Sequence, residues 1–189
     1  MCKDGNILVV SNLITYGQNP AETERNDVKG GLDNWPPHCG VERNGLHFAS
    51  QGGHLGVVVA LLEAKVNPEV GDIDASPALH YAVTGSDDYR ASCITRELLG
   101  HGAMVDAVSV NRDTALHLAS HAGHGRTVEL LLAMNADPEA SNNNGVTPLH
   151  EACDKGHPRI VGLLMRAGAI TVQEDFLSVE ALALFNNGE

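Results

Sequence analysis

The sequence has few aromatic residues, no long apolar run and no leader-like start. Aromatic residues make up 4% of the 189 residues, whereas hydrophobic residues of all kinds make up 43%, so a core must be built from Leu, Val and Ala. No stretch approaches the roughly 18 consecutive apolar residues of a membrane-spanning helix. The first residues lack the basic-then-apolar order of a signal peptide. We therefore expect no membrane insertion and an intracellular location, cytoplasmic by default with the nucleus not excluded.

Basic residues are also scarce. The chain has 12 Lys and Arg against 24 Asp and Glu, which gives a formal net charge of −12. A surplus of negative charge repels phosphate backbones and anionic lipid headgroups. It excludes nucleic acid as the expected partner and favours basic or neutral protein segments.

The sequence lacks the spacing of a metal site and the motifs of common active sites. Its four cysteines are scattered, with no Cys-x-x-Cys pair, which indicates neither a disulfide framework nor a zinc ribbon. There is no Gly-x-Ser-x-Gly, no phosphate-binding loop and no Gly-x-Gly-x-x-Gly. We expect no catalytic activity, no cofactor and no metal.

A repeated Leu-His pair is the dominant pattern that is present. The pairs end at His47, His80, His117 and His150, at steps of 33, 37 and 33 residues. The clearest unit, 141–169, has a Gly turn, a Thr-Pro helix start, a short helix, a Gly-His break, a second helix with an apolar stripe and a Gly-Ala stop. Two such short helices cannot bury their apolar faces alone, so the units must stack.

These motifs resemble the ankyrin-repeat family, whose pattern is close to Gly-x-Thr-Pro-Leu-His-x-Ala-x-x-x-Gly-His-x-x-x-Val-x-x-Leu-Leu-x-x-Gly-Ala. The resemblance covers about four fifths of the chain and implies an all-α solenoid of helix-turn-helix repeats joined by β-hairpin-like loops. It comprises four recognisable repeats plus terminal half-repeats. The expected segments are 1–20 (N-terminal half-repeat or cap helix), 21–43 (inserted loop), 44–69, 70–106, 107–139 and 140–172 (repeats one to four), and 173–189 (C-terminal half-repeat or cap helix).

Two inserts and several substitutions depart from the pattern. The loop at 21–43 carries Trp35, the only Trp, which is either pinned onto the solenoid or offered to a partner. The second repeat is four residues longer within 84–93, and we expect this insertion to lengthen the turn between its helices, either without a role or on a binding side. We expect Asn44 to cap the first helix of repeat one, and Ser76 to cap that of repeat two with Pro77 at its first helical position.

The ten histidines raise a metal hypothesis. His117 and His121 are spaced as two ligands on one helix, with His124 nearby. Yet His117 and His124 each occupy a slot that recurs in other repeats. In the family the histidines of the Leu-His pairs tie turns and neighbouring repeats together by hydrogen bonds, and that resemblance favours a structural role over a zinc site.

The resemblance implies a concave face lined by the hairpin tips and the exposed side of each first helix. These positions mix apolar, amide and acidic groups, which suits a protein or peptide segment, with a bias toward basic ones. We expect a monomeric protein–protein interaction module, or alternatively a regulatory or targeting segment of a larger enzyme whose catalytic domain lies outside this chain. The candidate contact residues are Arg43, Gln51, Ile73, Asp74, Ser76, Thr84, Val110, Asn111, Asp113, His121, Asn143, Asn144, Val146, Asp154 and Lys155.

Overall fold

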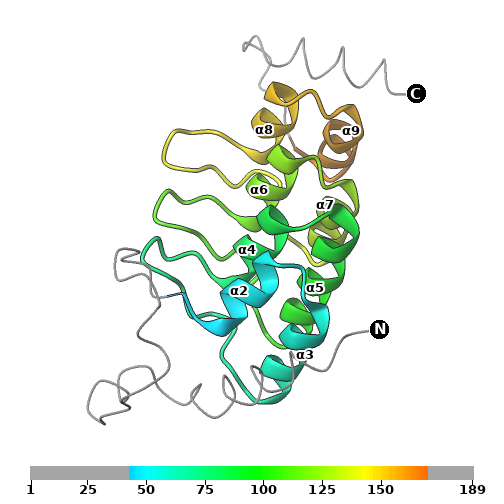
Figure 1. The fold of residues 1–189 in the computed structure, drawn as a ribbon. Coiled ribbons are helices and arrows are strands. Elements are labelled where there is room, and N and C mark those ends of the chain that lie inside the picture. The colour runs from blue at the N-terminus through cyan, green and yellow to red at the C-terminus, as the bar shows by residue number, and fades with distance from the viewer. Residues whose placement is uncertain (1–42, 170–189) are drawn as a thin grey trace.

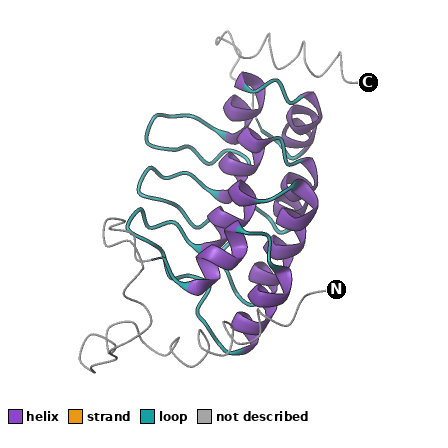
Figure 2. Cartoon of the chain, viewed as in Figure 1, coloured by secondary structure: helices purple, strands orange, loops and turns teal. Residues whose placement is uncertain are grey.

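The computed structural model describes residues 43–169, and every regular element within them is a helix (Figures 1 and 2). The helices are α2 (Gly45–Gln51), α3 (Leu55–Glu63), α4 (Ala78–Gly85), α5 (Asp88–Gly100), α6 (Ala115–Ala122), α7 (Gly125–Ala133), α8 (Pro148–Asp154) and α9 (Pro158–Arg166). The expected terminal half-repeats at 1–20 and 173–189, and the inserted loop with Trp35, lie outside the described residues.

The helices form two parallel rows. In one row α2, α4, α6 and α8 pack on one another in order, and in the other α3, α5, α7 and α9 do the same (Figure 1). Each first-row helix also packs on the following helix of the second row, and the long loops between repeats all project to one side (Figure 2). This single-file stack confirms the expected all-α ankyrin-type solenoid.

The core lies between the two rows and is aliphatic. An alanine follows each Leu-His pair by two positions on the first-row helices, and its small side chain lets neighbouring helices approach closely. These alanines are Ala49, Ala82, Ala119 and Ala152, all at most 5% exposed. The largest fully buried aliphatic side chains are Leu46, Leu61, Leu79, Ile94, Leu98, Leu116, Leu131, Ile160, Leu164 and Val58.

A buried histidine links each repeat to the next. The Nε2 atoms of His47, His80 and His117 lie 3.0–3.1 Å from the backbone oxygens of Ser76, Ala107 and Val146, respectively, at the start of the following repeat. Because a carbonyl oxygen only accepts, each Nε2 must carry the proton and donate it. The other ring nitrogen, Nδ1, is then an acceptor.

In repeat three, the residue at the helix N-cap supplies the donor for that acceptor. The Thr114 backbone N–H donates to His117 Nδ1 at 3.2 Å, and the Thr114 hydroxyl lies 2.8 Å from the same nitrogen. In repeat two the N-cap is Pro77, not Ser76 as expected, and the helix begins at Ala78. Proline has no N–H, and Nδ1 of His80 is buried without a hydrogen-bond partner.

The second repeat contains the four additional residues as helix rather than as turn. α5 has 13 residues, whereas α3, α7 and α9 have 9 each, so the expected longer turn is wrong. Asp87 caps α5 by accepting a hydrogen bond from the Arg90 N–H at 3.1 Å, and Asp88 follows in its first turn. Acidic residues at both positions stabilise a helix N-terminus, which favoured helix over loop.

The additional helical turn reaches the next repeat. The carboxylate of Asp88 accepts hydrogen bonds from the backbone N–H groups of Arg126 and Thr127, both at 3.0 Å, and from the Thr127 hydroxyl at 3.1 Å. These N–H groups lie in the first turn of α7, whose own N-cap residue His124 makes no side-chain cap. Repeat two therefore caps a helix of repeat three.

Lys65 and Asn135 take the left-handed backbone conformation at the ends of their repeats, with φ of 66° and 63°. Gly102 and Gly168 occupy the same slot in the other two repeats, at φ of 91° and 99°. Asparagine tolerates this conformation, whereas lysine incurs a steric cost of about 1 kcal/mol.

Replacing Pro77 with Thr is expected to stabilise the protein by about 1 kcal/mol. The new N–H and hydroxyl satisfy His80 Nδ1, a gain of about 1–3 kcal/mol that exceeds the roughly 0.4–1 kcal/mol lost because the unfolded chain becomes more flexible. Urea unfolding measures the change. The reverse exchange, Thr114→Pro, should lower the unfolding free energy by a similar or larger amount, and equal midpoints for all three proteins contradict this account.

Asp88→Ala is expected to lower the unfolding free energy by about 1–2 kcal/mol, the cost of losing a charged helix cap. Hydrogen exchange should accelerate at the amides of Arg126 and Thr127. Asp87→Ala is the matched control, because it removes a cap from α5 and should accelerate exchange at Arg90 instead. Unchanged protection in α7 of the Asp88 variant refutes the cross-repeat cap.

Candidate functional site

The candidate binding face begins with three hairpin loops, and the first and third share one internal hydrogen-bond pattern. In the first hairpin, Asp72 Oδ1 accepts from the backbone N–H groups of Asp74 and Ser76 at 2.9 and 3.0 Å. In the third, Asn142 Oδ1 accepts in the same way from the N–H groups of Asn144 and Val146, at 3.0 and 3.1 Å. In the second hairpin, Ser109 Oγ accepts from the Asp113 N–H alone, at 3.2 Å. A side-chain oxygen therefore contacts the backbone of every turn and leaves the tip side chains outside it.

Further hydrogen bonds join the hairpins side by side. The Val110 N–H donates to the Asp74 carbonyl at 2.8 Å, and the Asn143 N–H donates to the Asn111 carbonyl at 2.9 Å. The Asn143 side-chain amide also donates to the Val110 carbonyl at 3.0 Å. The three tips thus form one continuous edge whose spacing is set by backbone contacts.

The structure leaves most candidate contact residues exposed. Those exposed are Ile73, Asp74, Thr84, Val110, Asn111, His121, Asn143, Asn144, Asp154 and Lys155. Those half-buried are Arg43, Gln51, Ser76, Asp113 and Val146. Ile73 and Val110 are the large apolar members, 63% and 61% exposed, at equivalent tips of adjacent hairpins. Ser76 and Val146 also have a structural task, since their carbonyls accept from buried histidines.

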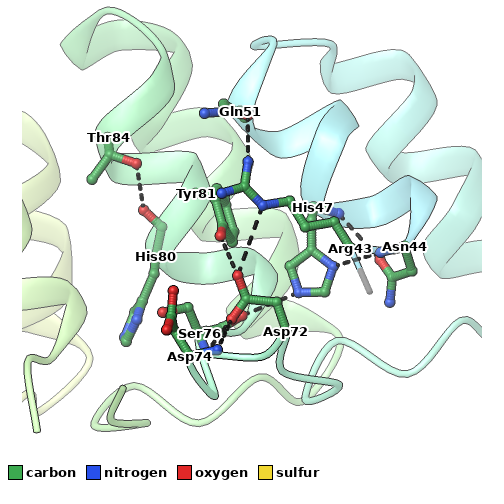
Figure 3. A network of polar contacts seen from close by, with 10 residues as sticks. All are labelled: Arg43, Asn44, His47, Gln51, Asp72, Asp74, Ser76, His80, Tyr81 and Thr84. Atoms are coloured by element: carbon green, nitrogen blue, oxygen red, sulfur yellow. Dashed lines mark hydrogen bonds and ion pairs between the residues drawn. The ribbon is translucent and has the colours of Figure 1, made fainter. Parts of the chain in front are cut away.

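A polar network lies at the end of the face formed by the first two repeats (Figure 3). The Arg43 guanidinium lies 4.3 Å from the ring centroid of Tyr81, with its Nε 3.8 Å from Asp72 Oδ2 and its Nη1 3.4 Å from Gln51 Oε1. The Tyr81 hydroxyl donates to the same carboxylate oxygen, Asp72 Oδ2, and the His47 ring meets the Tyr81 ring edge-on at 5.3 Å. The Asp72 side chain is fully buried and fully partnered.

The protonation states of this network follow from its contacts. Burial raises the pKa of the Asp72 carboxyl, but the hydrogen bonds from Tyr81, Ser76 and Asp74 outweigh it and hold that pKa below its ordinary value. Burial, together with the adjacent carboxylate, raises the pKa of Tyr81 to about 12. The pair therefore stays carboxylate and phenol across the neutral range, which preserves the network.

At the other end of the face, His121 Nδ1 lies 2.7 Å from Glu151 Oε2, a contact between α6 and α8. Lys155 Nζ lies 2.9 Å from Asp154 Oδ2, and its hydrogen bond and charge lower the pKa of that exposed carboxyl. These pairs are on the surface, where each contributes little to stability.

Sequence reasoning omitted three residues of this face. Two of them, Phe48 and Glu151, directly follow a Leu-His pair. Tyr81 and Leu118 fill this position in the other repeats, so the pattern indicates a core residue there. Phe48 is nevertheless 38% exposed. Arg112 is exposed in the left-handed slot of the second hairpin, at φ 63°. The third hairpin has Gly145 at the position of Arg112, and this difference was the available signal in the sequence. Any side chain placed at that position must point outward.

Within residues 43–169, no group of three His, Cys, Asp or Glu side chains gathers in the way a metal site requires. His117 is fully buried and hydrogen-bonded to backbone, while His121 pairs with Glu151. The described helices include none long and apolar enough to cross a membrane.

Comparisons with known proteins agree with the geometry. A family model described as ankyrin repeats in three copies matches residues 89–175. The chain is 34% identical to NF-kappa-B inhibitor alpha of Sus scrofa over 115 residues, 60% of this chain and 37% of that protein. It is 39% identical to the ankyrin repeat and KH domain-containing protein mask of Drosophila melanogaster over 95 residues, 49% of this chain and 2% of that protein.

The chain is also 31% identical to Palmitoyltransferase AKR1 of Lachancea kluyveri over 97 residues, 51% of this chain and 13% of that protein. It therefore spans no more than 37% of the length of any of these three relatives.

The buried histidines make stability depend on pH. Burial lowers the pKa of His47 and of His80 below 6.5, although hydrogen bonds to backbone carbonyls oppose the change. The two histidines contribute fully to stability above pH 6.5, where they are neutral in both the folded and the unfolded chain. This contribution is lost as the pH falls through 6.5 toward the pKa values of the folded protein, because the unfolded chain takes up protons first.

Urea unfolding between pH 7.5 and 5.5 should show a falling unfolding free energy, by up to about 1.4 kcal/mol per pH unit for each proton. His80→Gln should reduce that slope as well as the stability. His101→Gln, at an exposed position, should leave the slope unchanged. A slope that His80→Gln does not alter excludes this histidine as its origin.

Proposed function

Because this chain belongs to the ankyrin-repeat family, we propose that it is a protein–protein interaction module that binds a protein or peptide segment on its concave face. Ankyrin repeats are in general such modules. The proposal assigns the chain neither catalytic activity nor a cofactor. A monomeric state and an intracellular location belong to the proposal and rest on composition and resemblance alone.

The observation that carries the proposal is the continuous edge of hairpin tips. Backbone hydrogen bonds from Val110 to Asp74 and from Asn143 to Asn111 join neighbouring tips. The exposed side chains are therefore presented from a preformed support, and binding need not order the loops first. A pair of apolar tips, Ile73 and Val110, beside acidic and amide groups matches the mixed composition of protein interfaces.

Charge supports the bias toward basic segments. Asp74 is exposed with no side-chain partner among the described residues, and Asp113 engages one carboxylate oxygen with the Asn142 amide at 2.8 Å. The whole chain carries a net charge of −12. A basic partner segment gains attraction in both the encounter and the complex, whereas nucleic acid is repelled.

An alternative is that the chain is a regulatory or targeting segment of a larger enzyme. The match to Palmitoyltransferase AKR1 supports this alternative, because the matched segment is only 13% of a protein that is named as an enzyme. The parent reading frame decides the matter. A catalytic domain encoded in the same frame supports the alternative, and stop codons on both sides remove it.

The test of the proposed face is affinity capture from the native extract, identification of the retained protein and measurement of its Kd. Replacing Asp74, Asp113 and Asn144 together with Ala should weaken binding at least tenfold, the effect of a lost binding hot spot. The direct partner is expected to bind through a basic segment, which is checked with synthetic peptides from it.

The matched control removes the same number of charges elsewhere. Glu63→Ala with Glu129→Ala changes two exposed carboxylates on the outer helices α3 and α7 and should leave Kd within about twofold, as expected for charges outside an interface. Equal loss in both variants points to a general charge effect. Undiminished binding by the triple variant excludes this face.

A further inference from the structure

The third hairpin carries the run Asn142-Asn143-Asn144-Gly145, and its three side-chain amides have different surroundings. Asn142 is fully engaged, because its Oδ1 accepts two backbone N–H groups and its Nδ2 donates to Asp113. The Asn143 amide donates to the Val110 carbonyl at 3.0 Å. The Asn144 side chain is exposed at the tip and has no bonding partner among the described residues.

Gly145 leaves the space around this amide open. It takes φ of +73°, and a Cβ added to it would meet nothing within 4 Å. Without a side chain on the following residue, the backbone nitrogen of Gly145 can approach the Asn144 side-chain carbonyl carbon unhindered.

We propose that Asn144 is a site of self-modification, at which the chain deamidates without an enzyme. The Gly145 nitrogen bonds to Cγ of Asn144, and the Cγ–Nδ2 bond breaks. Ammonia leaves with the proton from the Gly145 nitrogen, and a five-membered imide remains. Water then opens the ring on one of two sides. Cleavage of the bond from nitrogen to Cγ gives aspartate, and cleavage of the bond to the backbone carbonyl carbon gives isoaspartate.

One weak contact holds the attacking nitrogen itself. The Gly145 N–H donates to the Asn142 carbonyl at 3.0 Å, so the turn must open before the nitrogen attacks. A single neutral hydrogen bond at an exposed tip disfavours the open form by no more than about tenfold. The folded protein should therefore deamidate within about tenfold of the rate of a free peptide of the same sequence.

The chain contains its own comparison. Asn44-Gly45 is the same dipeptide, but Asn44 Oδ1 accepts the N–H groups of Leu46 and His47 at 2.9 and 3.2 Å as the cap of α2, and Gly45 is the first helical residue. Reaction there requires unwinding the start of a packed helix. In the second hairpin Arg112 stands in the slot of Gly145, so its side chain hinders attack on Asn111.

Deamidation changes the charge and shape of the hairpin tip. Each product adds a negative charge, and isoaspartate also lengthens the backbone at residue 144, next to Asn143, which bonds to Asn111 and Val110. An effect on partner binding rests on the proposed function, whereas the modification itself does not. If the face binds basic segments, the aspartate product strengthens that preference with age.

The experiment incubates the full chain at mildly alkaline pH beside a synthetic peptide of residues 141–147. Peptide mapping by mass spectrometry follows the mass increase from amide to acid at each Asn-Gly pair, and an isoaspartyl methyltransferase assay counts isoaspartate. Asn144 should convert within about tenfold of the peptide's rate, the limit set by one turn hydrogen bond. Asn44 should convert at least tenfold more slowly than Asn144.

Asn144→Gln is the matched variant, because glutamine keeps the amide but must form a larger and slower ring. It should abolish the isoaspartate signal at the tip without altering the thermal unfolding midpoint. An unmodified Asn144 after the peptide has fully converted overturns the proposal, as does equal conversion of Asn44 and Asn144. Neither result bears on whether the concave face binds a partner, which the capture experiment decides separately.

Discussion

The stack depends on one interaction that recurs between its repeats, the hydrogen bond from a buried imidazole to a backbone carbonyl that precedes the first helix of the following repeat. His47, His80 and His117 are each at most 3% exposed, and each donates from Nε2 across the boundary. A buried donor is costly unless paired, so the spacing between repeats is fixed wherever the histidine is present. Aliphatic packing between rows supplies the bulk of the stabilisation, but it is less directional, and the imidazole sets the register.

The polar groups that hold the hairpins together are distinct from the side chains that the hairpins present on the surface. Backbone groups and buried side chains hold the hairpins, as Asp72 does by accepting from two backbone N–H groups and the Tyr81 hydroxyl. Tip side chains such as Ile73 and Val110 carry none of that task and remain exposed. A scaffold arranged in this way tolerates changes at its tips, which is why one fold can present many different surfaces. Asn144 is one of these tip side chains without a structural task, and the deamidation proposed for it takes place there.

The repeat pattern predicted the fold well because its signals are local. The N-cap at Asn44 formed as expected, since an Asn side chain satisfies free N–H groups two and three residues ahead regardless of distant contacts. The helix start in repeat two was wrong by one residue, because Pro77 took the cap position. The insertion was misread as turn, although Asp87 and Asp88 together were a helix-start signal. Neither error altered the order of repeats.

By itself, the sequence determined that the chain stacks as helical pairs, where most helices begin, and which residues lie at the hairpin tips, because a period of 33 residues and its capping motifs act within one repeat. Tertiary structure alone decided what passes between repeats: that Asp88 caps α7 39 residues onward, that the Arg43 side chain lies on the Tyr81 ring, and that His80 lacks a donor for Nδ1. These contacts depend on the angle and spacing at which repeats stack. No local pattern specifies that geometry.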